Sequence, residues 1–136
     1  MIRVCLAVLL MLCGCGPESI ERSTATLQCH TSITLKGTIE QKTFPGPPNY
    51  DDITKNPENY WILKLRDPVD VAKDPDSPAP DESQPQKDVR EIQLVTDYGK
   101  YRQFLGREVV VTGSLWQGFT VHHKTAVLMD VEEIHL

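Results

Sequence analysis

Cysteine, aromatic residues and positive charge are scarce in this sequence of 136 residues, a length typical of a single domain. Three of its four cysteines lie within the first 15 residues, so the rest of the chain holds only Cys29 and no disulfide framework. That thiol is either buried and inert, paired with another chain, or reactive. The net charge of −5 argues against a nucleic-acid partner, because general binders need a basic surface to displace counterions.

Catalytic motifs are also missing. The sequence has no Gly-x-Ser-x-Gly elbow, no Ser-x-x-Lys, no His-Glu-x-x-His and no glycine-rich phosphate loop. Asp51 and Asp52 adjoin each other in a proline-rich stretch, but paired carboxylates serve acid–base chemistry only where their environments differ. We therefore expect a protein that is not an enzyme and that holds no cofactor.

No apolar run is long enough to cross a membrane as a helix, which takes about 20 residues. The longest run, residues 4–13, follows the single cation Arg3 and has the length of the apolar part of a secretory signal. It ends in Leu12-Cys13-Gly14-Cys15, which resembles the bacterial lipobox, the motif in which the cysteine is acylated and becomes the mature N-terminus.

This resemblance implies a signal peptide over residues 1–14 and a lipid on Cys15. Gly16 follows the lipidated position, and the absence of an aspartate there favours the periplasmic face of the outer membrane. The alternative is an ordinary signal peptide and a soluble periplasmic or secreted protein. Cleavage after Gly16 would then leave Pro17 as the first residue, which ordinary signal peptidases tolerate poorly.

Five segments show the alternation of apolar and polar residues that is typical of a strand with one buried face. In the first of them Ile33, Leu35 and Gly37 share one side. The predicted strands are residues 32–40, 60–66, 89–95, 108–116 and 125–136.

A helix is predicted over residues 98–105. Tyr98, Tyr101 and Phe104 recur at helical spacing, Asp97 stands where an N-cap belongs, and Gly106 where a C-cap belongs. The resulting order of three strands, one helix and two strands is that of an OB-like five-stranded Greek-key barrel. The alternative is an open α+β sheet.

Gly37 and Gly113 fit such a barrel as the bulges or bends that let long strands curl. The barrel domain would cover residues 31–136, after a polar tether at residues 15–30. Residues 67–88 contain five prolines and seven acidic residues, so we expect a disordered loop between the second and third strands.

Several sequence runs together resemble the domain of unknown function family 4431: FPGPPNY at 44–50, YWILKL at 60–65, IQLV at 92–95, LG at 105–106, VVVTGSL at 109–115 and HHKTAVL at 122–128. The family is bacterial and has no assigned activity, so the resemblance implies a small exported domain and no catalytic residue. Where the family has a histidine-rich hairpin before the last strand, this chain has only GFTVHH at 118–123.

The candidate ligand-binding residues are aromatic, because OB-like barrels often bind oligosaccharides or oligonucleotides by stacking on exposed rings. Trp116, Phe119 and Tyr60 form such a predicted platform, with His122 and His123 beside it. The partner expected here is an envelope protein, a peptide or a glycan. The alternative is that these rings only pack against the domain.

Adjacent His122 and His123 also raise the question of a metal. Zinc needs three or four ligands that converge on one point, and neighbours in a strand point to opposite faces. We therefore predict no metal site. The alternative is a metal-binding protein that uses His122 and His123, with Cys29 and His30 if the fold brings them together.

Overall fold

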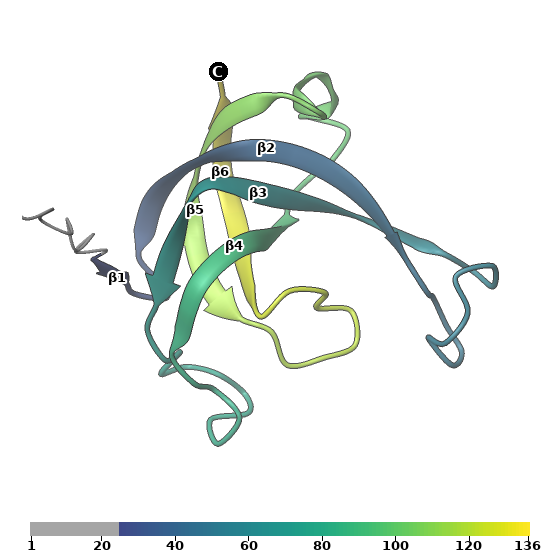
Figure 1. Cartoon of the computed structure of the whole chain (residues 1–136), viewed down its shortest axis with the longest axis horizontal. Helices are drawn as coiled ribbons and strands as arrows, with labels where there is room; N and C mark the ends of the chain where they lie inside the picture. Colours follow the sequence, from purple (N-terminus) through teal and green to yellow (C-terminus); the bar gives the residue numbers. More distant parts are fainter. Residues whose placement is uncertain (1–24) are drawn as a thin grey trace, which may run out of the picture.

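The computed structural model describes residues 25–136, which are mostly β (Figure 1). Its elements are β1 (Thr26–Leu27), β2 (Ser32–Phe44), β3 (Glu58–Val71), β4 (Gln86–Val95), the 3-10 turn η1 (Arg102–Phe104), β5 (Glu108–Gln117) and β6 (Val127–His135). The predicted signal peptide, Cys15 and the first part of the tether lie outside the described residues. No helix in the described range is long and apolar enough to cross a membrane.

The predicted alternation is clean in β5, whereas β3, β4 and β6 each bury three consecutive residues. In β5 the buried residues are Val109, Val111, Gly113, Leu115 and the polar Gln117, with half-exposed residues between them. Apolar side chains from β2, β3, β4 and β6 meet them, including the fully buried Ile39, Leu63, Ile92 and Met129. Burial of one face of each strand thus supplies the main stabilising term of the domain.

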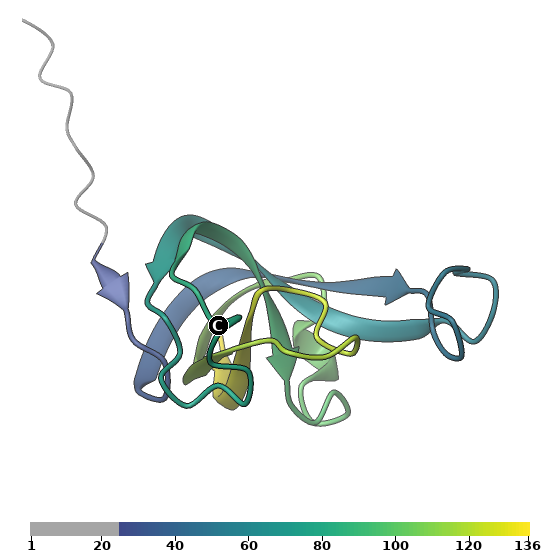
Figure 2. The ribbon, with the colours of Figure 1, turned by 90° about the horizontal axis from the view of Figure 1, so that it is seen from below.

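The strand pairings close into a ring. β3 pairs with β2, β2 with β5, β5 with β6, β6 with β4, and β4 again with β3. All of these pairs are antiparallel except β4–β6. Beyond this ring, β2 and β3 run on together as a hairpin that projects from the body (Figure 2). We call this hairpin, residues 42–60, the arm.

The two glycines predicted as bulges or bends both lie at close contacts between strands, and Gly113 is at an irregularity of the pairing. Gly37 pairs with both Leu65 of β3 and Val109 of β5, and a Cβ atom there would lie 2.3 Å from the Lys64 carbonyl oxygen. Gly113 stands at the register shift between β5 and β6, where a Cβ atom would lie 2.2 Å from the Asp130 carbonyl oxygen. Only a residue without Cβ fits either position.

The predicted helix is wrong. Residues 98–105 form turns and the short η1 instead. Tertiary contacts decide this, since the ring of Tyr98 stacks on Trp61 with centroids 4.6 Å apart and Tyr101 is buried. Asp97 does cap the turn, because its Oδ1 accepts the Gly99 N–H at 2.9 Å. The predicted apolar face is therefore right and the element type is not.

The predicted five strands become six, because β1 pairs in parallel with Asp70–Val71 of β3. The sheet thus includes residues of the predicted tether, where Cys29 is also buried. The predicted boundaries of the loop at residues 67–88 are wrong as well, since β3 continues to Val71 and β4 begins at Gln86. Its residues Asp74 and Ser83 are buried by partners far away in the sequence.

Candidate ligand-binding site

The connection between β5 and β6, residues 118–126, covers the side of the sheet opposite the core. Gln93 points to that side because its neighbours Ile92 and Leu94 are in the core. Ile62 and Leu128, which lie next to Gln93 in register, are also buried without joining the core cluster. We call residues 118–126 the cover loop.

The side chain of Gln93 holds the cover loop in place. Its Nε2 donates to the His122 carbonyl oxygen at 3.1 Å, and its Oε1 accepts the Lys124 N–H at 2.6 Å. The Gln93 backbone N–H donates to Thr125 Oγ1 at 2.8 Å. Gln93 is buried, so these bonds replace its contacts with water and favour one conformation of the loop.

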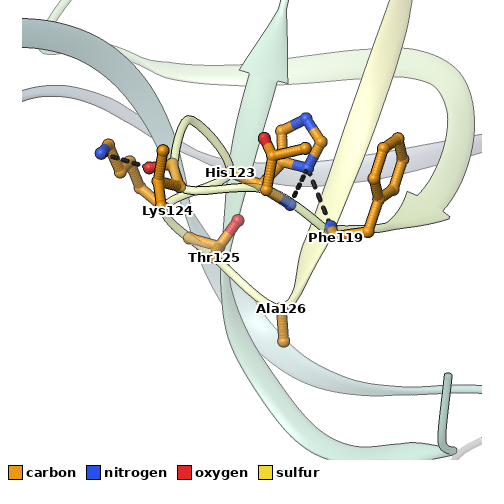
Figure 3. Close-up of a pocket in the computed structure, with 8 residues that line it drawn as sticks. Phe119, His123, Lys124, Thr125 and Ala126 are labelled. Carbon is orange, nitrogen blue, oxygen red and sulfur yellow. Dashed lines mark hydrogen bonds between the residues drawn. The ribbon is translucent and has the colours of Figure 1, made fainter. Parts of the chain in front are cut away.

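His123 organises the exposed half of the cover loop. Its Nδ1 accepts the N–H groups of Phe119 and Thr120 at 2.9 and 3.1 Å, as Figure 3 shows. Its ring packs edge-on against Trp116 and Phe119, with both centroid distances at 4.8 Å. Because Nδ1 accepts two hydrogen bonds, the ring is neutral with its proton on Nε2. Burial and the nearby His122 lower the pKa of His123, which favours the same form.

A depression of about 560 Å³ lies along this loop, lined by Gly118 to Val121 and His123 to Ala126 (Figure 3). Two of the lining residues are well exposed to solvent, Phe119 at 43% and Val121 at 58%. The indole of Trp116 supports Phe119 at a centroid distance of 6.1 Å and donates from Nε1 to Asp130 Oδ1 at 3.1 Å. The result is an apolar surface on a constrained loop.

A second aromatic cluster joins the cover loop to the arm. Lys124 Nζ lies 5.6, 5.3 and 5.7 Å from the ring centroids of Phe44, Tyr50 and Tyr60. The same Nζ lies 4.0 Å from Glu58 Oε2. We call Phe44, Tyr50, Glu58 and Tyr60 the arm cage.

The five predicted ligand-binding residues thus divide between two adjacent clusters. Trp116, Phe119 and His123 meet at the cover loop. Tyr60 belongs to the arm cage, and His122 packs edge-on against Tyr50 of that cage at 5.7 Å, with Nδ1 3.6 Å from Glu58 Oε2.

The two adjacent histidines do not converge on one point, because the ring of His123 faces Trp116 and Phe119 whereas that of His122 faces the arm cage. Within residues 25–136 no group of three or more histidine, cysteine or acidic side chains is placed to hold a metal ion. His30 lies instead against Asp74, with Nε2 2.7 Å from Oδ1.

Cys29 precedes His30 in the chain and lies near the buried Asp74. Burial, and after it the negative charge of Asp74, raises the pKa of the Cys29 thiol to about 11. The thiol is therefore protonated at neutral pH, which makes it a poor nucleophile and a poor metal ligand. Of the three possibilities open for Cys29, the buried and inert thiol fits this environment.

Sequence reasoning missed Gln93, Lys124, Tyr50 and Glu58. Gln93 stands at an outward position of a strand, where a polar residue normally faces solvent, so its place in the alternation does not mark it, although it lies in the run IQLV of the family resemblance. Lys124 and Tyr50 lie in the runs HHKTAVL and FPGPPNY that carry the family resemblance, which is the one signal that would have singled them out.

Comparison with known families supports that resemblance. Residues 91–135 match the family described as Domain of unknown function (DUF4431). This segment is similar to that family. It contains half of β4, all of β5 and β6, and the cover loop with Gln93, His123 and Lys124. The arm cage is contributed by residues outside the matched range. The chain matches no curated protein and no solved structure.

Proposed function

We propose that this chain is a non-enzymatic binding module of the bacterial cell envelope, anchored by a lipid on Cys15, that binds a peptide segment of another envelope protein at the cover loop. The closed ring of β2 to β6 supports an OB-like barrel, a fold that commonly binds ligands on one sheet face and its adjoining loops. The cover loop lies on such a face.

The observation that carries the proposal is the exposure of Phe119 and Val121 on a loop that hydrogen bonds hold in place. Exposed apolar side chains gain free energy when a partner covers them. A loop already held in one conformation loses little further entropy on binding. A peptide with apolar side chains suits both the depression and the aliphatic Val121.

The chemistry of the site also supports binding without catalysis. His123 is the nearest base to the depression, but its Nδ1 is occupied by two backbone N–H groups. A general base needs a free lone pair within reach of the proton that it removes. The Cys29 thiol, protonated and buried, is no substitute nucleophile.

Site-specific photocrosslinking in cells tests this proposal. A photoreactive phenylalanine analogue at Thr120, which lies between Phe119 and Val121, should crosslink the full chain to a protein. The same analogue at the exposed Gln103 of η1 is the matched control. Combined Phe119→Ser and Val121→Ser substitutions should remove the crosslink from Thr120 without affecting expression.

Two results would overturn the proposal. One is crosslinking at Thr120 that does not exceed that at Gln103 or that survives the double substitution. The other is an adduct that glycosidases remove and proteases do not, since a glycan would then be the ligand.

A further inference from the structure

We propose that the arm cage is a binding site for an alkylammonium group, and that Lys124 occupies it as an internal stand-in for that ligand. This inference uses the arm and not the exposed half of the cover loop, so it does not depend on the binding of a peptide to Phe119 and Val121.

The cage belongs entirely to one hairpin. Phe44 ends β2 and pairs with Glu58 of β3, and Tyr60 follows two residues later on the same strand. Tyr50 lies in the connection, where its N–H donates to the Gly46 carbonyl oxygen at 3.1 Å. The rings therefore stand together because of strand pairing and a tight turn, and the cover loop contributes the cation together with His122, which packs on the edge of Tyr50.

Contacts inside the hairpin orient the cage before a cation enters it. The Tyr60 hydroxyl donates to Glu58 Oε2 at 2.9 Å, and the rings of Phe44 and Tyr60 lie 6.1 Å apart. Burial, followed by the hydrogen bond to Glu58, raises the pKa of Tyr60 to about 12, so this hydroxyl stays a donor at neutral pH. Lys42, which pairs with Tyr60 across the two strands, forms an ion pair with Glu91.

The chemistry of the cage suits an ammonium group. A cation within about 6 Å of a ring centroid is attracted by the ring quadrupole, and cages of several rings are the usual recognition site of quaternary ammonium and methylated lysine groups. Here three rings satisfy this distance at once and Glu58 adds a negative charge. Only 10% of the Lys124 side chain is exposed, so its ammonium has exchanged much of its water for the cage.

Lys124 can leave the cage without unfolding the cover loop. Its backbone N–H is held by Gln93, whereas its Nζ has one hydrogen bond in the described part of the chain, to the Val121 carbonyl oxygen at 2.5 Å. An external ammonium then competes with a tethered one. The apparent association constant of the external ammonium is its intrinsic value multiplied by the fraction of molecules in which the cage is open.

The test compares wild-type protein with Lys124→Ala, using choline as the probe and its neutral isostere 3,3-dimethylbutanol as the control ligand. Tyrosine ring resonances measured by NMR report binding. We expect Lys124→Ala to bind choline at least about tenfold more tightly than wild type, following the removal of the internal competitor. The neutral isostere should not bind, and Lys124→Ala with Tyr50→Leu should lose the affinity.

Lys100 offers a matched control, because its Nζ also lies over one tyrosine ring, that of Tyr101 at 5.0 Å. Lys100→Ala should leave choline binding at the wild-type level. Should Lys124→Ala fail to fold, Lys124→Gln replaces it, and the wild-type protein supplies a measurement without any substitution. There, saturating choline should shift the ε-methylene protons of Lys124 from ring-shielded positions toward their free values.

Any one of three results would overturn the proposal. They are equal choline affinity of wild type and Lys124→Ala, binding of the isostere as tight as that of choline, and an affinity that Tyr50→Leu leaves unchanged. Nα-acetyl-lysine methylamide, which keeps its free side-chain ammonium, and the same compound trimethylated on Nε distinguish the sources of the group. Tighter binding of the first assigns the cage to a lysine side chain, and tighter binding of the second to a quaternary ammonium. Failure of both amines together with choline would refute the site.

Discussion

Single polar side chains with several partners hold the loops of this protein in place. Gln93 and Asp74 form hydrogen bonds across long sequence separations, whereas His123 accepts two within the cover loop, and each is wholly or partly buried. Because a buried polar group that loses its partners costs free energy, such residues determine the loop conformations more strongly than local propensity does.

Acid should loosen the exposed half of the cover loop. The pKa of His123 lies below its usual value of 6.5, so the unfolded chain binds a proton more readily than the folded one. The stabilisation is complete above pH 6.5 and is lost as the pH falls through the lower, folded-state pKa. We expect hydrogen exchange of the Phe119 and Thr120 amides, corrected for its intrinsic rate, to accelerate over that range.

His123→Asn provides the comparison for this prediction, because the Asn Oδ1 can still accept hydrogen bonds but does not titrate. Exchange in that variant should show no pH dependence beyond the intrinsic rate. His135→Asn, at an exposed position of β6, should behave as wild type. An identical pH dependence in His123→Asn and wild type would contradict the prediction.

Removal of the Asp74 carboxylate should destabilise the whole domain. Asp74 is 2% exposed, and its oxygens accept from the N–H groups of Gln117 and Asp76 and contact His30. We expect Asp74→Ala to lower the free energy of unfolding by about 2–4 kcal/mol, since buried N–H groups are left without acceptors. Urea denaturation measures the change, with Asp81→Ala, exposed in the same segment, as the control.

The effect of Asp74→Ala should depend on pH. Burial raises the pKa of Asp74, but the hydrogen bonds from Gln117, His30 and Asp76 together outweigh it, so the pKa lies below 3.8. The carboxylate therefore stabilises the fold above pH 3.8, and this contribution is lost as the pH falls through the folded-state value. A difference between the variant and wild type that is as large in strong acid as at neutral pH would contradict this account.

At the scale of the elements, alternation predicted the strands well and periodicity predicted the helix badly. An alternating pattern is a direct record of one buried face, as the full burial of Val111 and Leu115 shows. The spacing of Tyr98, Tyr101 and Phe104 also reflects burial of one face, but consecutive turns can place these rings on one side as well as an α-helix can. The stacking of Tyr98 on Trp61 selects the turns and the short η1.

Substitution of Gly113 tests the register shift that bends β5 against β6. A Cβ atom at Gly113 would lie 2.2 Å from the Asp130 carbonyl oxygen and 2.9 Å from Met129 Cγ, so the backbone of β6 must move. We expect Gly113→Ala to lower the free energy of unfolding by about 3 kcal/mol in urea denaturation. Gly99→Ala, where the nearest atom is the flexible Asp97 carboxylate, should cost no more than about 1 kcal/mol. Similar losses in the two variants would argue against a steric role for Gly113.

At the scale of the whole molecule, the closed ring brings together segments that are far apart in the sequence. The β3–β4 and β4–β6 pairings set the cover loop beside the arm, so that residues 44–60 and 118–126 share one surface. The buried network around Asp74 likewise joins the end of β5 to residues 72–84. The surfaces proposed to bind ligands therefore depend on ring closure and not on any single element.

Lipid anchoring is the prediction that concerns the intact chain. We expect a fatty-acid probe to label the wild-type protein in bacterial cells and to leave Cys15→Ala unlabelled, because the cysteine thiol is the attachment point of the lipobox. Cys29→Ala is the control, and it should keep the label, since its buried thiol is protonated and unreactive. The absence of label from the wild type would refute the lipoprotein prediction.

The sequence by itself determined the strands, the glycines at which they bend, the apolar faces and the family resemblance confirmed over residues 91–135. These are local properties, because burial alternates along one strand and a missing Cβ belongs to one residue. Only the tertiary structure decided the extra strand β1, the turns in place of the helix, and the division of the aromatic residues between cover loop and arm cage. Each of these arises from contacts between residues far apart in the chain, which exist only once the ring of strands has closed.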